Sequence, residues 1–312
     1  MAFETNSVLA TTVAGMTFRN PVLLAAGTAA FGREIADVVN LQDIGGIVTK
    51  AVSTNLRAGA PAPRVAEFDG GMINAVGLAN PGVDEVRMHD LPWLASNARG
   101  ARVIVNVVGD TTEDYAAVVR GLEGEAGVDA FELNVSCPNV KAGGMEFGAD
   151  PRALSDVVGG ARRATRLPLF VKLSPTLADI ATMARLAADC GADAITLVNT
   201  LPGMVVDVEA RRPALGFGRG GVSGPGLLPV GVLATWTVRR AVKLPLVGVG
   251  GIATEMDALQ YLIAGASLVA IGTAAMKDPG VPARVVVGLE RWCQKHGIGS
   301  VSEIVGSLEW PQ

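Results

Sequence analysis

The sequence predicts an α/β protein with the architecture of a (β/α)8 TIM barrel. Short apolar runs alternate along the 312 residues with segments of helical character, and within the runs polar and apolar residues do not alternate. Such strands are covered on both faces, as in a parallel sheet flanked by helices. Eight repeats in about 300 residues suit a closed barrel, with an open doubly wound sheet as the alternative. No linker interrupts the pattern, so we expect residues 1–312 to form a single domain.

Eight apolar runs are the expected barrel strands. Each is four to six residues long, the usual length of a strand, and Val and Ile, which favour strands, are frequent in them. In chain order they span residues 22–25, 46–49, 102–107, 131–135, 169–173, 194–198, 246–249 and 268–271.

Capping residues indicate where the helices begin and end. Thr111 precedes two acidic residues, which stabilise the positive end of a helix. Asp150 and Pro151 suit the N-cap and the first helical position, and Gly191 and Gly265 suit helix ends. The expected helices span residues 35–42, 111–122, 150 onward, 176–190, 225–242, 255–264 and 281–295.

Composition excludes several classes of function. The formal net charge of −4 and the pI near 5.3 argue against binding to nucleic acid or to an anionic membrane. We see no apolar run long enough to span a membrane and no secretory signal at the N-terminus. Three scattered cysteines suit a reducing compartment, so we expect a cytoplasmic protein. The two histidines lack partners at ligand spacing, and we expect no metal site.

Polar residues follow the expected strands at their carboxyl ends, where barrel proteins bind their ligands. A lysine within the apolar run LFVKLS is costly unless it meets an anion or a ligand, although solvated strand ends are the alternative interpretation. Two long stretches, 52–97 and 201–224, also leave this end, and long segments of this kind are usually functional. The polar residues are Lys50, Asn106, Asn134, Cys137, Lys172, Asn199 and Thr200.

Cys137 lies in the run NVSCPN, directly after the fourth expected strand. Asparagines stand on both sides of it, and Pro138 makes the turn stiff. The thiol has no second cysteine nearby for a disulfide or a metal. A buried packing residue is the alternative, but the setting favours a thiol that acts as a base toward a bound planar ligand.

Glycine-rich turns in the last three βα units suggest a phosphate site. The runs SGPG, GVGGI and IGTA follow positions where a barrel commonly binds phosphate through backbone N–H groups. Tight turns alone would also explain these glycines, and none of the runs is a dinucleotide fingerprint. The glycine-rich turns suit the phosphate of a cofactor, and the lysines at the strand ends suit a ring that gains negative charge. FMN has both of these properties.

These motifs, in this order, resemble the dihydroorotate dehydrogenases over about residues 8–306. The matching runs include VTKAVS, MINAVGLANPG, ELNVSCPN, FVKLSP, LVNT, GGVSGP, VGVGGI and AIGTA. The cysteine at position 137 resembles the one in class 1 enzymes. Resemblance to the NAD-linked class 1B catalytic subunits lies in the runs NAVGLANPGVDEV and TLPGMVVDVEARRPALGFGRGGVSGP. The resemblance implies oxidation of dihydroorotate to orotate in pyrimidine biosynthesis, with hydride transfer to FMN and Cys137 as the base.

The resemblance also implies roles for individual residues. Ala26 stands where the family usually has Ser, so at most its backbone contacts FMN. The implied substrate ligands are Lys50, Asn74, Ala75, Val76, Gly77, Leu78, Asn134, Asn199 and Thr200. The implied FMN ligands are Ala26, Lys50, Ala51, Asn106, Asn134, Lys172, Val198, Gly224, Gly250, Gly251, Gly272 and Thr273.

The resemblance further implies an assembly. The chain has neither a dinucleotide site nor a cysteine cluster, so class 1B chemistry requires a partner subunit that carries FAD and a 2Fe–2S cluster. A homodimer of catalytic subunits with two such partners would form a heterotetramer. The alternatives are a fumarate-linked class 1A enzyme or a related flavin pyrimidine reductase, a phosphosugar isomerase or lyase without flavin, and a flavin electron-transfer protein without substrate chemistry.

Overall fold

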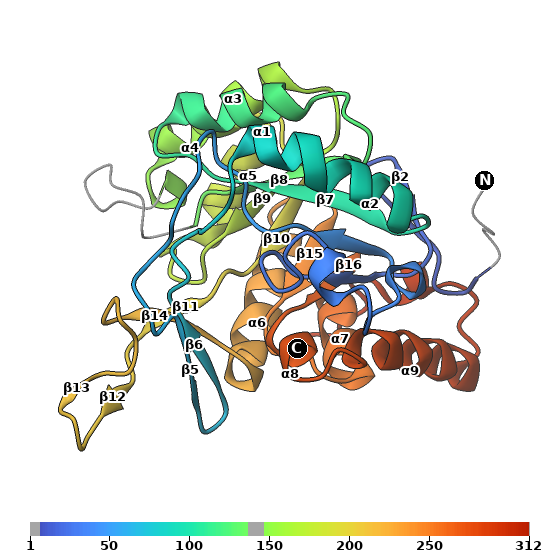
Figure 1. Cartoon of the computed structure of the whole chain (residues 1–312). Coiled ribbons are helices and arrows are strands. Elements are labelled where there is room, and N and C mark those ends of the chain that lie inside the picture. Colours follow the sequence, from blue (N-terminus) through green and yellow to red (C-terminus); the bar gives the residue numbers. More distant parts are fainter. Residues whose placement is uncertain (1–6, 137–146, 312) are drawn as a thin grey trace.

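The computed structural model describes residues 7–136 and 147–311, and a closed barrel of parallel strands forms its centre (Figure 1). The strands follow one another around the barrel in chain order, and the last pairs with the first. The predicted TIM-barrel fold is therefore confirmed. The barrel strands are β3 (Val22–Leu24), β4 (Gly46–Val48), β7 (Arg102–Val107), β8 (Ala130–Asn134), β9 (Leu169–Leu173), β10 (Ala194–Leu197), β15 (Leu246–Val249) and β16 (Leu268–Ile271).

Helices form the outer layer of the barrel. Thr111 and Thr254 cap their helices with reciprocal side-chain and backbone hydrogen bonds, and Asp150 caps the helix that Pro151 begins. Among the described residues, no helix has both the length and the apolar character needed to cross a membrane. The α-helices are α1 (Val83–Glu85), α2 (Leu91–Asn97), α3 (Thr112–Leu122), α4 (Pro151–Ala164), α5 (Ile180–Asp189), α6 (Leu228–Arg239), α7 (Glu255–Ala264), α8 (Thr273–Lys277) and α9 (Val281–His296).

Shorter helical turns connect these elements. A π-helical stretch, η3 (Val86–Asp90), joins α1 to α2, so that one helical segment covers residues 83–97. The 3-10 turns are η1 (Arg33–Ile35), η2 (Leu41–Asp43), η4 (Phe147–Ala149), η5 (Pro225–Leu227) and η6 (Val301–Ile304).

Three predicted helices differ from the observed ones. The predicted helix over 35–42 is wrong, because only the turns η1 and η2 form there. Asn40 accepts a hydrogen bond from the amide of Gln42 and starts a new turn. The β-branched residues Val38 and Val39 disfavour a helix between the turns η1 and η2. The helix predicted over 176–190 begins only at Ile180, after the Asp179 cap. The helix predicted over 225–242 begins as η5 and is α-helical only over α6.

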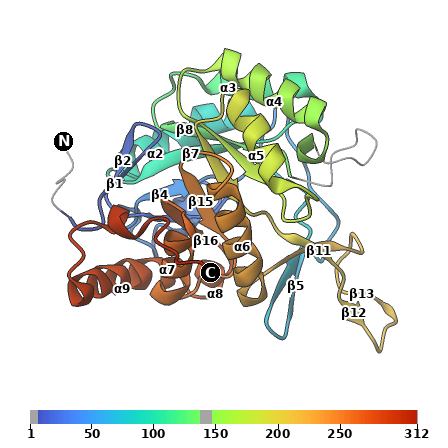
Figure 2. The same cartoon turned by 180° about the vertical axis from the view of Figure 1, so that it is seen from behind.

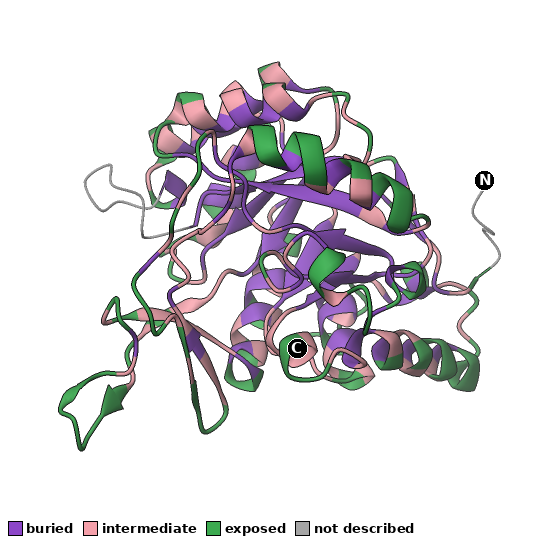
Figure 3. Ribbon diagram, in the orientation of Figure 1, coloured by how far each residue is buried: buried purple, intermediate pink, exposed green. Residues whose placement is uncertain are grey.

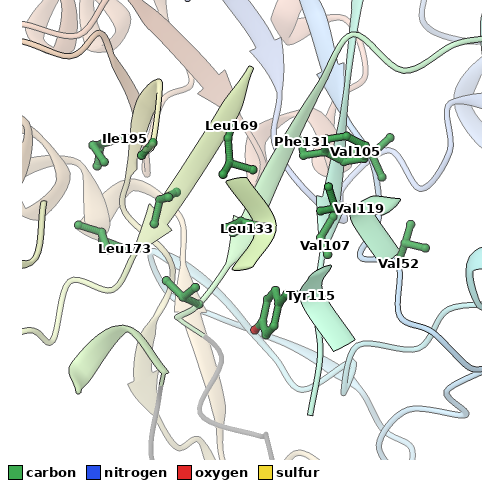
Figure 4. Packing of buried hydrophobic residues seen from close by; sticks show 14 of the residues in the cluster. Val52, Val105, Val107, Tyr115, Val119, Phe131, Leu133, Leu169, Leu173 and Ile195 are labelled. Atoms are coloured by element: carbon green, nitrogen blue, oxygen red, sulfur yellow. The ribbon is translucent and has the colours of Figure 1, made fainter. Parts of the chain in front are cut away.

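The amino end of the barrel is closed by a hairpin that was not predicted. Its strands, β1 (Thr11–Val13) and β2 (Met16–Phe18), pair antiparallel. Val13, Met16 and Phe18 pack with inward-facing apolar residues of the barrel strands in one buried cluster. A second and larger cluster fills the space between the strands and the helices, and Figure 4 shows part of it around Tyr115 and Leu133.

Parts of the two long stretches pair to form one antiparallel sheet. The sheet order is β11 (Leu201–Gly203), β14 (Gly220–Ser223), β6 (Gly71–Asn74) and β5 (Val65–Phe68). A smaller hairpin, β12 (Val206–Asp207) with β13 (Arg212–Pro213), extends beyond it. Figure 2 shows both projecting from the barrel, and Figure 3 shows that the hairpin β12–β13 is exposed. The stretch 52–97 also holds the helical segment 83–97, which completes the barrel repeat between β4 and β7.

Candidate active site

The polar residues of the barrel strands point into the barrel near its carboxyl end. On β8, Phe131 and Leu133 pack against the helices, whereas Ala130 belongs to the interior cluster. Side chains alternate along a strand, so Glu132 and Asn134 share the inward face with Ala130. On the neighbouring strands, Asn106, Lys172 and Thr196 each lie two positions after a residue of the interior cluster. Their side chains therefore also face the inside of the barrel.

Glu132 lies at the centre of this polar layer, although the sequence analysis did not select it. Asn106 donates from Nδ2 to Oε1 of Glu132 at 2.8 Å, and Thr196 donates from Oγ1 to Oε2 at 2.8 Å. Glu132 is 2% exposed. A glutamate within the apolar run AFELN, two residues before Asn134 and therefore on the same strand face, was the signal that could have found it.

A second polar group lies at the rim, after β8 and β10. Asn199 donates from Nδ2 to Oδ1 of Asn134 at 3.3 Å and to Oγ of Ser136 at 2.7 Å. The Ser136 hydroxyl also donates to Oδ1 of Asn134 at 3.2 Å. From α3, the Tyr115 hydroxyl donates to the backbone oxygen of Asn134 at 2.9 Å. The structure thus brings together two of the predicted substrate ligands, Asn134 and Asn199, and adds Ser136.

Two lysines contribute positive charge to this end. Lys172 is only 7% exposed, and in the sheet it lies between Asn134 of β8 and Thr196 of β10. Lys50 follows β4, and its amide donates to the backbone oxygen of Ala30 at 2.8 Å. Within the described part of the chain, neither ammonium group has a carboxylate oxygen within 4.0 Å. A buried cation without a counter-ion favours an anionic ligand.

Asn74 and Thr200 meet at the inserted sheet. Asn74 ends β6 and donates from Nδ2 to the backbone oxygen of Gly221 at 3.3 Å. The backbone of Gly221 also lies against Thr200, because a Cβ there would be 2.0 Å from the Thr200 hydroxyl. The pairing of β14 with both β6 and β11 therefore brings these two predicted substrate ligands to the same residue, Gly221, although they are far apart in sequence.

Asn80 anchors the segment that carries the other predicted substrate ligands, Ala75, Val76, Gly77 and Leu78. Its buried Oδ1 accepts from the amides of Ser53 at 3.2 Å and Gly82 at 2.9 Å. Its Nδ2 donates to the backbone oxygen of Leu78 at 2.8 Å, and Leu78 has a left-handed φ of 56°. A leucine in that conformation needs support from its surroundings. Sequence reasoning missed Asn80, although it belongs to the quoted run NAVGLANPG.

The predicted phosphate residues lie in the turns after β14, β15 and β16. The Thr273 hydroxyl donates to the Ser223 hydroxyl at 2.7 Å, which joins the start of α8 to the end of β14. Gly251 has a φ of 72°, and a Cβ there would lie 2.6 Å from the amide nitrogen of Leu228 at the start of α6. In the described residues, the amides of Gly251 and Gly272 donate to no protein acceptor. The remaining predicted residues of this group are Gly224 and Gly250, both at positive φ.

Tyr261 supports these turns from α7. Its hydroxyl donates to the backbone oxygen of Gly250 at 2.8 Å. Burial, together with the negative charge of Asp257, raises the pKa of Tyr261, so the hydroxyl remains a donor at neutral pH. The turn after β15 is therefore fixed by a neutral hydrogen bond.

The other predicted residues lie near these groups or outside the described range. Ala26 is half-buried and packs on the interior cluster, and Ala51 and Val198 are buried. Cys137, the predicted base, lies outside the described residues. Among those that are described, no group of histidine, cysteine and acidic residues is arranged to hold a metal ion. Of the other two cysteines, Cys293 is buried in α9 and Cys190 is half-buried at the end of α5.

A closed barrel with a polar carboxyl end and glycine turns after its last strands defines a TIM-barrel protein built to bind a ligand at that end. The family profile described as Dihydroorotate dehydrogenase matches residues 8–292. The chain belongs to the dihydroorotate dehydrogenase family.

Curated relatives are similar over nearly the whole chain. A protein of Desulforudis audaxviator is 49% identical over 298 residues, which cover 96% of each chain. A protein of Pelobacter propionicus is 47% identical over 297 residues, 95% of this chain and 97% of the relative. A Geobacter protein is 46% identical over the same shares. All three carry the name "Dihydroorotate dehydrogenase B (NAD(+)), catalytic subunit".

Proposed function

We propose that this chain is a catalytic subunit that oxidises (S)-dihydroorotate to orotate in the synthesis of pyrimidines, as the NAD-linked class 1B enzymes do. The observation that carries the proposal is the gathering of Lys172 with Asn106, Asn134 and Asn199 at the carboxyl end of a barrel whose relatives bear this name. Orotate and its dihydro form carry a carboxylate and two amide groups, which lysine and asparagine side chains bind well. Residues 1–312 would act as one catalytic domain in the cytoplasm.

FMN fits the residues of this end. Among the described residues, the buried Oδ1 atom of Asn106 has no hydrogen-bond donor and the buried Lys172 has no carboxylate within 4.0 Å. Both need a ligand that offers a donor and an electron-rich oxygen or nitrogen, as an isoalloxazine does. The free amides of Gly251 and Gly272 suit a phosphate. Val198, Gly224, Gly250 and Thr273 line the same turns and strand ends and would complete the cofactor site.

In the proposed reaction, dihydroorotate loses a proton from C5 and a hydride from C6. When bound, FMN would accept the hydride. The Cys137 thiolate would take the C5 proton, Lys50 and Lys172 would stabilise the negative charge that develops, and Asn74, Asn134, Asn199 and Thr200 would hold the polar edges of the pyrimidine. A free thiol titrates near pH 8.5, so the rate should rise with pH across the neutral range.

We propose that electrons then pass to NAD through a second subunit that carries FAD and a 2Fe–2S cluster. The word subunit in the relatives' name supports a partner. Two catalytic chains and two partners would form a heterotetramer. Expression together with such a subunit should yield a complex that reduces NAD with dihydroorotate, whereas the catalytic chain alone should not. Rapid reoxidation of the isolated chain by fumarate would instead indicate a class 1A enzyme.

The test of the catalytic assignment is Cys137→Ala. We expect this variant to bind FMN normally but to reduce it with dihydroorotate at least about 100-fold more slowly than wild type, since a general base contributes about 10² to 10⁴ in rate. Anaerobic stopped-flow measurement of the visible flavin absorbance gives the rate. Cys190→Ala, which removes a half-buried thiol from the end of α5, is the matched control and should reduce FMN at the wild-type rate. Normal reduction by Cys137→Ala would contradict the assignment.

A further inference from the structure

Glu132 is a buried acid that the proposed chemistry does not use. Its two carboxylate oxygens each accept one hydrogen bond, from Asn106 and from Thr196, and both donors are neutral. Within the described residues, no basic side chain lies within 4.0 Å of it. An acidic side chain is rarely buried this deeply without a role, because water would solvate it better.

The carboxylate decides which way the amide of Asn106 faces. A carboxylate accepts hydrogen bonds and donates none, so only the nitrogen of the Asn106 side chain can face Glu132. The amide oxygen of Asn106 must then point elsewhere inside the barrel, and this oxygen is buried and has no donor in the described part of the chain. Buried acceptors nearly always have a partner in native proteins.

The neighbouring hydroxyl and ammonium groups do not supply that partner. The Thr49 hydroxyl accepts from the backbone amide of Asn106 at 3.2 Å and gives its own proton to the backbone oxygen of Lys50 at 2.9 Å. In the described residues, Lys172 makes no hydrogen bond to Asn106. Because the described residues supply no donor, a ligand bound at this end of the barrel would provide the missing one.

We propose that Glu132 is a positioning residue of the cofactor site, which holds the Asn106 amide so that its oxygen accepts from an N–H group of the bound flavin. The inference rests on the proposed FMN site. Oxidised isoalloxazine has a single ring N–H group, the imide at N3, so the donor is identified by chemistry. The opposite amide orientation would present an NH2 group to this imide, and two donors would then face each other without an acceptor.

The test compares the binding of FMN with that of N3-methyl-FMN, which lacks the imide hydrogen. Apoprotein is reconstituted with each flavin, and the dissociation constants are measured by quenching of flavin fluorescence. Wild type should bind N3-methyl-FMN at least about tenfold more weakly than FMN, the loss expected for one buried hydrogen bond. In Glu132→Gln, either end of the new amide can face Asn106, so Asn106 can turn over and the ratio should fall below about threefold.

Thr196→Val is the matched control, because it removes the other hydrogen bond to Glu132 but leaves the carboxylate on Asn106. Its ratio between the two flavins should remain as in wild type. If Glu132→Gln does not fold, Glu132→Met combined with Thr196→Val replaces the acid and one donor together by apolar groups and serves the same comparison.

The outcomes separate this inference from the proposed function. Wild type that binds neither flavin would contradict the FMN site itself. Wild type that binds both flavins equally, or an unchanged ratio in Glu132→Gln, would overturn the role of Glu132 while leaving FMN binding intact. Equal loss of the ratio in Thr196→Val and Glu132→Gln would also overturn it, because the effect would then not depend on the orientation of Asn106.

Discussion

The amino and carboxyl ends of the barrel interior differ in polarity, and the change occurs between residues only two positions apart on the same strand. On β9, Phe170 belongs to the apolar cluster at the amino end, and Lys172 lies in the polar layer at the carboxyl end. On β10, Ala194 and Thr196 differ in the same way. The amino end is closed by the hairpin β1–β2, whereas the carboxyl end holds a carboxylate, amides and two lysines. The difference indicates that the amino end stabilises the fold, whereas the carboxyl end holds polar groups, one of which, Asn106 Oδ1, has no hydrogen-bond partner among the described residues.

The largest expected effect is on stability at the amino end. Phe170→Ala removes a fully buried aromatic ring from the barrel interior and should lower the free energy of unfolding by about 3–5 kcal/mol, measured by urea denaturation of the apoprotein. Lys172→Met keeps the side-chain length and removes an unpaired buried cation, so it should cost much less or even stabilise the apoprotein. A larger loss from Lys172→Met than from Phe170→Ala would reverse the comparison.

A smaller effect is expected at Asn80, which supports the carboxyl end from the inserted segment. Asn80→Ala leaves the amides of Ser53 and Gly82 without an acceptor and should cost about 2–3 kcal/mol, measured in the same way. The KM for dihydroorotate should also rise, because Leu78 loses its support. Ser53→Ala is the control, since it leaves the bonds of Asn80 to Gly82 and Leu78 in place and should cost less. Equal KM values for both variants would show that Asn80 does not position the segment.

Tyr115→Phe tests the hydrogen bond between the Tyr115 hydroxyl and the backbone of Asn134 at the rim. The variant leaves the backbone oxygen of Asn134 without the Tyr115 hydroxyl, while the aromatic ring stays packed among the apolar residues shown in Figure 4. We expect a loss of about 1 kcal/mol in thermal or urea unfolding. A loss as large as that of Phe170→Ala would mean that the rim contributes to stability as much as the amino end does.

The smallest effect concerns an exposed charge at the carboxyl side. Hydrogen bonds from the side chain and the backbone of Thr182 lower the pKa of Asp179, the cap of α5. A carboxyl group with a lowered pKa stabilises the fold above its unfolded pKa, and this contribution disappears as the pH falls below about 4. Asp179→Asn keeps a capping side chain but should flatten the loss of stability in that acidic range, as measured by urea unfolding at several pH values. An unchanged acid profile would contradict the prediction.

Much of the barrel could be predicted because its signals are local. Apolar runs and capping residues such as Thr111 and Asp150 depend on neighbours in sequence, and they located the barrel strands to within a residue or two. The helix over 35–42 failed because the side chain of Asn40 competes for a backbone amide, which an apolar pattern does not reveal.

The candidate site was less predictable where it depends on distant pairing. Lys172 was selected because a lysine in an apolar run is conspicuous, yet Glu132 in a similar run was not, since its donors Asn106 and Thr196 come from other strands. The contacts of Asn74 and Thr200 with Gly221 depend on a sheet formed by segments about 130 residues apart, and neither segment carries a sequence signal for this pairing. The roles assigned to the predicted ligands stay predictions that the experiments above address.

The inserted sheet has a consequence for how this protein can be altered. In it, β14 is the inner strand that joins β11 to β6, and so the two insertions complete one another. Deleting residues 201–223 would leave β6 with a row of unpaired backbone groups, a template for pairing with another chain. Replacing only one insertion by that of a relative therefore carries a risk of aggregation. The two segments should be exchanged together, as one unit.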